Sequence, residues 1–379
     1  MRVITRQLTK EILLSTGFLL IALVSLFAFF DLIGQLDDVA EGRTIMHAFM
    51  LTAFTLPARI YEVMPLAALL ASVYTMSRWA STSEFTCLRV AGMSPVTLAA
   101  SLLLPGIILV GITYTFGEFV APASSRYADE VKSISKNQTT LTARGYSSGV
   151  WVRDVTTNEA GNEVDRYINV KYLSATNSSE TGGWRLFEFD KDGRILVFIE
   201  SESARFEQNL GWHLKNVVRY DYPVFDARDC AQLDSRIEMT KSDDYLLRTT
   251  LGPDTLSVMT VKPNTMSMRD LDRYVSHLKK NNQQSEHYEV AFWNKAFYPF
   301  ATLVMIALAM PFAYMNARSG GLAIKMFVGV MIGILFYALN NLFSYLGVLN
   351  TWSPIVVSLV PTVTMLIIAT VAMYLVERR

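Results

Sequence analysis

The chain has 379 residues, of which 51% are hydrophobic, and equal numbers of acidic and basic side chains, so its charge gives no reason to bind nucleic acid. Its apolar residues lie in long blocks at both ends, around a polar middle of mixed charge, which excludes a single soluble core. The two cysteines, Cys87 and Cys230, fall in segments that we expect on opposite sides of a membrane, which excludes a disulfide between them within one chain.

Six apolar segments are long enough to cross a membrane as helices. A bilayer core of about 30 Å needs roughly 20 mostly apolar helical residues. Three such segments precede the polar middle and three follow it, at residues 12–36, 58–77, 96–120, 292–315, 322–346 and 355–376. The first is too long for the apolar core of a signal peptide and has no small-x-small cleavage site, so we expect it to be retained as a span.

Lysine and arginine set the expected orientation, because loops that stay in the cytoplasm carry an excess of them. The loop after the first span is acidic, with Asp31, Asp37, Asp38 and Glu41, and the loop between the last two spans is uncharged. We therefore predict that both termini are cytoplasmic and that residues 121–290 lie outside. The basic residues beside the predicted cytoplasmic ends are Arg2, Arg6, Lys10, Arg78, Arg89, Arg318, Lys325, Arg378 and Arg379.

The polar middle shows the period-2 alternation of half-buried strands. The predicted strands cover residues 150–152, 167–172, 184–189, 195–199 and 212–217, with a hairpin turn at Asp192-Gly193. Many short strands predict a sandwich or an open jelly roll. One helix should follow, capped by Ser267, with an apolar stripe of Met268, Leu271, Tyr274, Val275 and Leu278.

Signatures of catalysis are missing from the sequence. No Gly-x-x-x-x-Gly-Lys-[Ser/Thr] loop and no Gly-x-Ser-x-Gly elbow occur, so we expect no ATP hydrolysis and no catalytic residue in this chain. The four histidines, His47, His213, His277 and His287, lack the spacing of metal ligands. We therefore predict no metal, no cofactor and no enzymatic activity.

Charged residues within the spans are all expected near their outer ends. These are Asp31, Arg59, Glu62, Glu118 and Lys295, and none lies near the predicted midplane, where an ion relay would need one. Two interpretations of Arg59 remain open. It could pair with Glu62 three residues away, or Arg59 and Lys295 could reach the phosphates of a lipid.

Residues 81–92 predict a short cytoplasmic helix between the second and third spans. A Ser or Thr should cap its start, Glu84 lies in its first turn, and Gly92 should end it. Phe85 and Leu88 offer apolar contacts, which suits docking into a groove on a cytoplasmic partner, whereas the alternative is a helix resting on lipid headgroups. In the fifth span, Gly329 and Gly333 allow close helix packing, either within the chain or between subunits.

The whole chain resembles the lipopolysaccharide export permeases LptF and LptG, more closely the LptG branch. The similarity is carried by Met64-Pro65-Leu66-Ala67-Ala68-Leu69-Leu70, by Ser83-Glu84 through Ala91-Gly92-Met93-Ser94, and by Gly117-Glu118-Phe119-Val120-Ala121-Pro122. It continues in the predicted helix 267–279 and in Phe292-Trp293-Asn294-Lys295-Ala296-Phe297-Tyr298-Pro299. The order of three spans, a β domain and three spans is itself unusual.

The resemblance implies a membrane α-helical fold of six transmembrane helices with an inserted periplasmic β-jellyroll domain, in the inner membrane of a Gram-negative bacterium. The implied domains are residues 1–121 with the coupling helix at about 81–92, then 122–266 as the jellyroll, 267–290 as a connecting helix, and 291–379.

The resemblance also implies the function and the partners. Such a permease pairs with its homologue LptF. Two copies of the ATPase LptB, which binds the ATP and magnesium, would drive it. It would pass lipopolysaccharide to the jellyroll proteins LptC and LptA. Glu84, Phe85, Leu88 and Arg89 would contact the ATPase. The lipid would enter between spans one and five of the paired subunits.

One departure from the family concerns the lipid contacts. Relatives of the LptG branch often carry lysines at the outer end of the first span, where this chain has Asp31, Asp37 and Asp38. Direct phosphate contact from the first span is then not expected, and a divalent cation bridge or contacts from Arg59 and Lys295 would take its place, with Asp31 and Glu62 as further candidate lipid contacts. Two other functions stay open: an ion-coupled secondary lipid transporter, and a membrane scaffold that binds partners through its β domain.

Overall fold

A computed structural model gives the structure of the chain. It describes residues 2–40, 44–135, 140–141, 149–157, 163–174, 179–207, 210–223, 237–249, 251–253, 256, 263–280, 283, 285–314, 321–349 and 352–377. The chain divides into two compact units. The first comprises Met1–Ala128, Pro263–Asp272 and Glu286–Arg379, and the second comprises Asp129–Lys262 and Arg273–Ser285. Among the expected features, Glu41, Cys230, Arg318, Arg378 and Arg379 lie outside the described residues.

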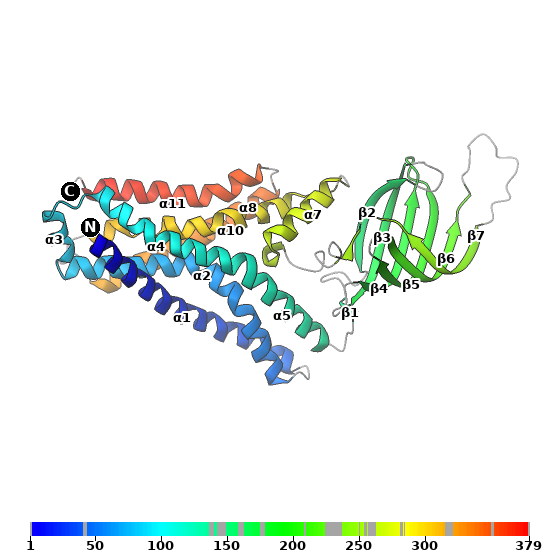
Figure 1. Ribbon diagram of the computed structural model, residues 1–379, viewed down its shortest axis with the longest axis horizontal. Helices are drawn as coiled ribbons and strands as arrows, with labels where there is room; N and C mark the ends of the chain where they lie inside the picture. The colour runs from blue at the N-terminus through cyan, green and yellow to red at the C-terminus, as the bar shows by residue number, and fades with distance from the viewer. Residues whose placement is uncertain are drawn as a thin grey trace. The chain divides into compact units, whose positions relative to one another are not determined.

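The first unit is helical. Its helices are α1 (Arg2–Ala40), α2 (Ile45–Ser81), α3 (Glu84–Val90), α4 (Pro95–Thr115), the π-helical segment η1 (Phe116–Val120), α5 (Ala121–Ser135), α8 (Glu286–Leu308), α9 (Met310–Tyr314), α10 (Leu322–Leu349) and α11 (Pro354–Glu377). Six stretches within them are long and apolar enough to cross a membrane, which confirms the six predicted spans. The start of α1, α3 and the end of α11 gather at one end of the helices (Figure 1).

Several helices extend beyond the predicted spans, most clearly at the start of α2 and after α4. The second span was predicted from residue 58, but α2 begins at Ile45, because its first turns are apolar enough to continue the helix. The third span was expected to end near residue 121, but α4, η1 and α5 form one unbroken helical run to Ser135. Polar residues do not end a helix by themselves when no glycine or cap is present.

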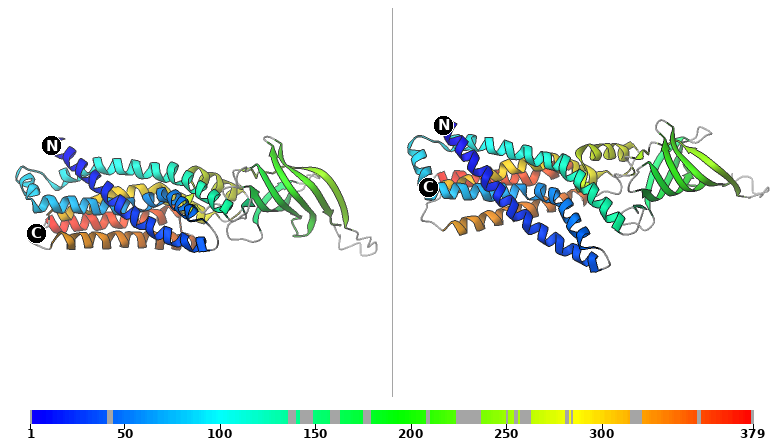
Figure 2. Two further views of the ribbon diagram at one scale, coloured as in Figure 1. Left: turned by 90° about the horizontal axis from the view of Figure 1, so that it is seen from below. Right: turned by 60° about the horizontal axis from the view of Figure 1, so that its bottom comes forward.

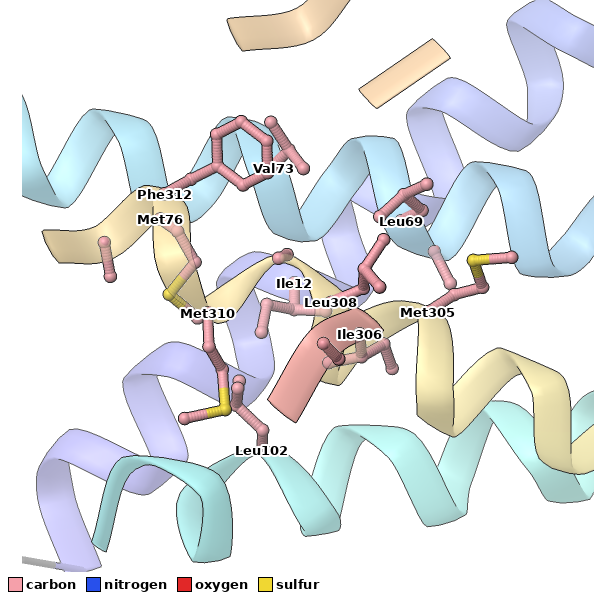
Figure 3. Packing of buried hydrophobic residues seen from close by; sticks show 14 of the residues in the cluster. Ile12, Leu69, Val73, Met76, Leu102, Met305, Ile306, Leu308, Met310 and Phe312 are labelled. Atoms are coloured by element: carbon pink, nitrogen blue, oxygen red, sulfur yellow. The ribbon is translucent and has the colours of Figure 1, made fainter. Parts of the chain in front are cut away.

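The core of the first unit forms where α2 and α8 pass through the middle of the bundle (Figure 3). Met305, Ile306 and Leu308 of α8 are almost completely buried, with Leu69 and Met76 of α2. The remaining spans surround this pair, and α1 crosses the bundle obliquely with much of its length exposed (Figure 2). Helices α2 and α8 are therefore the most buried of the six spans.

Gly329 and Gly333 of α10 face α2. A Cβ at Gly333 would lie 2.1 Å from Leu66 Cδ1, and one at Gly329 would lie 3.2 Å from Leu70 Cδ2. Only glycine allows this close approach of the two helices. The sequence left open whether these glycines serve a contact within the chain or between subunits, and the structure shows a contact within the chain.

The second unit contains a seven-stranded antiparallel sheet in the order β1-β3-β4-β5-β6-β7, with β2 also paired to β3. The strands are β1 (Thr140–Leu141), β2 (Val150–Thr157), β3 (Glu163–Ser174), β4 (Glu180–Phe189), β5 (Ile195–Glu207), β6 (Gly211–Asp221) and β7 (Glu238–Leu247). The inserted β domain is thereby confirmed, with its five predicted strands at β2 to β6. Within the described residues the strands form one up-and-down sheet, not the two packed sheets of a sandwich.

Side chains that alternate along these strands form the core of the sheet. Trp184 and Trp212 are fully buried, with ring centroids 5.0 Å apart, and each indole N–H has an oxygen acceptor. The predicted turn at Asp192-Gly193 joins β4 to β5, and Gly193 has φ of 76°, which glycine adopts without strain. Strand β7 was not predicted, because its exposed, acidic sequence lacks alternation and becomes a strand by pairing with β6.

The predicted connecting helix is α7 (Met268–Lys280), which begins in the first unit and continues in the second. Ser267 Oγ accepts the N–H of Asp270 at 3.1 Å, so the predicted cap is confirmed. The stripe is buried at Leu271, Tyr274 and Leu278. Before it, η2 (Pro263–Thr265) brings the chain back to the first unit.

Candidate transport and coupling sites

The first group of charged side chains joins α1 to α2. Arg59 donates to both carboxylate oxygens of Asp31, at 2.9 and 2.8 Å, and to Glu62 Oε2 at 2.9 Å. Its guanidinium also lies 5.7 Å from the ring centroid of Phe27. One cation therefore meets two carboxylates and an aromatic face, and its charge is balanced within the chain. Lipid binding by Asp31, Arg59 and Glu62 stays a prediction.

A second group of contacts, which we call the clasp, ties the spans to the segment that leads into α7. Glu118 Oε2, on η1, accepts the N–H of Met268 at 2.8 Å, and Arg126 of α5 pairs with Asp270 at 2.6 Å. The ammonium of Lys295, on α8, donates to the carbonyl of Met266. The clasp thus consists of Glu118, Arg126 and Lys295 from the spans, and of Met266, Met268 and Asp270 from the segment.

Glu118 is placed for this contact by local helix geometry. The π-helical turn of η1 inserts an extra residue into the helix and changes the direction of the side chains that follow. The N–H of Met268 is one of the backbone donors that the first turn of a helix leaves without an intrahelical partner. A carboxylate that accepts such a donor is further stabilised by the helix dipole. Glu118 is only 8% exposed, so little water competes for this contact.

In one of the two interpretations left open by the sequence, Lys295 reaches the phosphate of a lipid, and the structure gives it a different partner. Its side chain is 8% exposed and its ammonium binds the Met266 carbonyl. The physical reason is that the returning chain passes directly over this part of α8, where its carbonyl needs a donor. A lipid could reach Lys295 only after the clasp had opened.

Close packing beside the clasp depends on one glycine. A Cβ at Gly117 would lie 2.5 Å from Cε2 of Tyr61, so η1 and α2 approach each other over a position without a side chain. Tyr61 also packs on Tyr298 of α8, with ring centroids 5.0 Å apart, and the Tyr298 hydroxyl donates to the Glu62 carbonyl at 2.5 Å. The charged end of the bundle is therefore held by α2, η1 and α8 together.

At the opposite end of the bundle, α3 connects α2 to α4. Phe85 is 2% exposed and packs between Trp79 of α2 and Tyr314 of α9, with ring centroids at 5.9 and 6.1 Å. The prediction that Phe85 offers an apolar contact to a partner is wrong, because the aromatic side chain anchors α3 to the bundle. Arg89 lies 5.2 Å from the Tyr314 ring centroid.

The ends of α3 are only partly as predicted. Ser83 has φ of 63° and makes no side-chain cap, so the predicted Ser cap is absent; Thr82 Oγ1 instead donates to Glu84 Oε1 at 2.9 Å. Gly92 ends the helix as predicted, with φ of 90° and its N–H donating to Arg89 O, while Met93 N–H donates to Leu88 O. Together these two bonds make a Schellman motif that fixes how α4 begins.

Several spans present apolar side chains outward, and α1 and α10 are the least buried of them. On α1 the exposed large residues include Phe18, Ile21, Phe29 and Phe30, and on α10 they include Phe327, Met331, Ile334 and Tyr345. Both helices pack against α2. Such surfaces suit lipid chains or the spans of another subunit.

The sequence matches the family of lipopolysaccharide export system permeases LptF/LptG over residues 6–376. The chain belongs to this family. The permease is 26% identical to the lipopolysaccharide export system permease protein LptG of Escherichia coli strain K12 over 97% of its own length and 96% of that protein. It is 24% identical to the protein of the same name from Haemophilus influenzae, over 96% of its own length and 95% of the relative.

The clasp was not found by reading the sequence of the permease. Glu118, Lys295 and the residues around Ser267 each lie in a motif that carried the family resemblance, but no periodicity relates motifs about 150 residues apart. A signal was nevertheless present, because a buried acid and a buried base inside apolar spans need polar partners.

Proposed function

We propose that the permease is the membrane subunit of an ATP-driven exporter that extracts lipopolysaccharide from the outer leaflet of the inner membrane. It would work beside its homologue LptF, with two copies of the cytoplasmic ATPase LptB supplying the energy. Lipopolysaccharide would then pass to periplasmic jellyroll domains, including those of LptC and LptA. Family membership supports the class of transporter, and the arrangement of charged side chains supports the direction of transport.

The orientation rests on where the cations lie along the bundle. Arg6 and Lys10 lie near the start of α1, Arg78 in the last turn of α2 and Arg89 in the last turn of α3. The start of α1 and α3 lie at the same end of the bundle (Figure 1). An excess of lysine and arginine favours the cytoplasmic side. With α3 in the cytoplasm, the Asp31–Arg59–Glu62 group and the clasp belong to the periplasmic end, and the β domain is periplasmic.

The substrate explains why energy and an apolar route are both needed. Each methylene moved from lipid into water costs about 0.8 kcal/mol, so a chain of a dozen methylenes costs roughly 10 kcal/mol. An acyl chain therefore has to move between apolar surfaces. The outward apolar faces of α1 and α10 would form the wall of such a cavity together with the paired subunit.

Coupling would follow the two most buried spans. Phe85 of α3 contacts Trp79 of α2 and Tyr314 of α9, immediately after α8. Farther from α3, near their middles, α2 and α8 meet through Tyr61 and Tyr298. A displacement of α3 by a bound ATPase would therefore reach the periplasmic end through packed, nearly rigid helices. This continuity from α3 to the charged end is the observation on which the proposal chiefly depends.

Lipid phosphates would have to compete with carboxylates for Arg59. The Asp31–Arg59–Glu62 group carries two acids against one base, so a phosphate needs either displacement of Asp31 or a divalent cation between the acids and the lipid. Arg59→Gln should then reduce extraction of lipopolysaccharide in proteoliposomes, and added Mg²⁺ should restore it partly if the cation bridge is used. Unchanged extraction would exclude Arg59 as a lipid contact.

The test of coupling uses Glu84 and its neighbour. Glu84→Lys, in the full chain reconstituted with its partners, should release the ATPase while the permease still folds and inserts. The control is Thr82→Ala, which removes the hydrogen bond that Glu84 receives within the chain. This variant should keep the ATPase bound. If Glu84→Lys retains the ATPase and full lipopolysaccharide release, α3 is not the coupling element.

The two alternative functions have distinct signatures. An ion-coupled transporter would stop when an uncoupler is added and would be indifferent to vanadate, whereas the proposed exporter shows the reverse. A scaffold would leave lipopolysaccharide delivery intact after depletion of the permease, provided that its partner complexes still assemble.

A further inference from the structure

A groove of about 680 Å³ lies between the first turns of α1 and the middle of α4. Its rim carries the hydroxyls of Thr5 and Thr9 and the cations of Arg6 and Lys10. Deeper along α1 the groove becomes apolar, where Leu13 and Leu14 face Leu104 of α4. Figure 2 shows the start of α1 beside the start of α4.

The cations of the groove have no ionic partner among the described residues. Arg6 and Lys10 are exposed and four residues apart, so their side chains leave the helix on the same face. The nearest acid on α1, Glu11, is engaged elsewhere, since it accepts Trp79 Nε1 at 2.7 Å and lies 3.6 Å from Arg78. Two uncompensated positive charges therefore stand at one rim of an apolar groove.

Hydroxyl contacts link α1 to α4 at this rim. Thr9 Oγ1 donates to the Thr5 carbonyl at 2.7 Å, and Thr5 Oγ1 lies 3.2 Å from Ser101 Oγ of α4. This contact joins the two helices at the polar rim. Below it, Leu14 and Leu104 remain 63% and 48% exposed, so the apolar part is not filled by the chain itself.

We propose that this groove binds an anionic phospholipid of the leaflet that faces the cytoplasm, with its phosphate at Arg6 and Lys10 and the start of one acyl chain along Leu13, Leu14 and Leu104. The leaflet rests on the orientation given under the proposed function. From Arg6 to Leu14 the helix rises about 12 Å, which places charge and apolar surface at the separation of a headgroup and its upper methylenes.

Charge decides between this lipid and other occupants. A zwitterionic lipid gains little from two cations, and an apolar helix of another subunit would leave both cations buried without a counter-charge. Basic side chains at the membrane surface attract anionic headgroups and contribute about a fivefold gain in binding each. The bound lipid would fill the space between α1 and α4, and α1 is among the least buried of the spans.

The experiment measures lipid bound to the full-length chain in mild detergent by native mass spectrometry. Phosphatidylglycerol, phosphatidylethanolamine of the same chains, and inorganic phosphate are titrated separately. The wild type should prefer phosphatidylglycerol, and Arg6→Gln/Lys10→Gln should weaken that binding about 25-fold. The charge-preserving swap Arg6→Lys/Lys10→Arg should stay within about threefold. Leu104→Trp, which fills the apolar part, should weaken lipid binding with both cations present.

Matched controls separate this site from general charge effects. Arg89→Gln removes a cation at the same end of the bundle and should leave phosphatidylglycerol binding unchanged. All variants are checked by gel filtration and circular dichroism, and Leu104→Trp tests the proposal even if the double glutamine variant misfolds. Equal affinity for the two lipids, saturation by inorganic phosphate alone, or no effect of Leu104→Trp would each overturn the proposal.

The orientation is tested separately, so that failure of the proposed function can be distinguished from failure of the lipid-binding proposal. Lys10→Cys, in a Cys87→Ser/Cys230→Ser background, should resist a membrane-impermeant maleimide added outside intact cells after removal of the outer membrane. Labelling from outside would overturn the orientation and the leaflet, while phosphatidylglycerol binding in detergent would still stand.

Discussion

Removal of the Glu118 carboxylate should weaken the clasp. In Glu118→Ala the N–H of Met268 loses its acceptor in a site where Glu118 is 8% exposed. A hydrogen bond to a charged group contributes about 1.5–3 kcal/mol, and the helix dipole adds about 0.3–1 kcal/mol. Arg126 and Lys295 still hold Asp270 and the Met266 carbonyl, so we expect a loss of about 2–3 kcal/mol in the free energy of opening residues 263–272.

The assay is hydrogen–deuterium exchange of the full-length permease in detergent, followed by mass spectrometry of peptides that cover residues 263–272. A loss of about 2–3 kcal/mol predicts exchange about 30- to 150-fold faster in these amides. Glu118→Gln keeps an oxygen acceptor but removes the charge, so its exchange should rise only about two- to fivefold. Amides in the middle of α2 serve as an internal reference.

A neighbouring substitution shows whether the effect is specific. Thr115→Ala removes an exposed hydroxyl that donates to the Gly111 carbonyl, one turn before Glu118. Exchange at residues 263–272 should not change in this variant. Equal acceleration in Thr115→Ala and Glu118→Ala, or no acceleration in Glu118→Ala, would refute the reasoning that the carboxylate holds the start of α7.

Three further predictions, two substitutions and one pH dependence, follow from the packing and burial of other groups. Gly117→Ala should lower the midpoint of thermal unfolding, because a Cβ would lie 2.5 Å from Tyr61 Cε2 and displacing that ring costs about 1–3 kcal/mol. Arg166→Met should destabilise the sheet to urea by about 3–5 kcal/mol, since Glu188, 2.7 Å from Arg166, would be left buried without its partner. Burial lowers the pKa of His277 below its ordinary value of 6.5 in the folded protein. Because the unfolded chain then binds a proton at His277 more readily than the folded protein does, the stability should fall as the pH drops from 6.5 toward the lower folded pKa.

The controls for these substitutions lie in the same chain. Gly111→Ala places a Cβ where no atom lies within 4 Å, so its thermal midpoint should match the wild type. Arg185→Met breaks an exposed pair with Glu200 at 3.1 Å and should cost less than about 1 kcal/mol in urea. His277→Gln should remove the loss of stability below pH 6.5, and a pH profile identical to the wild type would contradict the assignment to His277.

Local patterns predicted most of the fold but few of the side-chain contacts. A span is a local property, because about 20 apolar residues are enough to define it, and six spans were identified in this way. Strands β2 to β6 were found by alternation, and the turn at Asp192-Gly193 by its residue types. Strand β7 has no such local pattern and exists because β6 pairs with it.

The direction of individual side chains required the tertiary structure. From sequence, Phe85 was expected to face a partner and Lys295 a lipid, but Phe85 fills a space between α2 and α9, and Lys295 meets the returning chain at Met266. The sequence allowed Gly329 and Gly333 to contact either a helix of the same chain or a helix of another subunit. The structure places Leu66 and Leu70 of the same chain beside them.

The amino-acid sequence by itself determined the number of spans, the inserted sheet and the family of the permease. Hydrophobic length, alternation and motif identity are each encoded within a few neighbouring residues. Only the tertiary structure decided which charges are balanced inside the chain and which remain available. That distinction depends on contacts between helices that are far apart in the sequence. A buried charge is costly unless it is paired, and its partner comes from one of these helices.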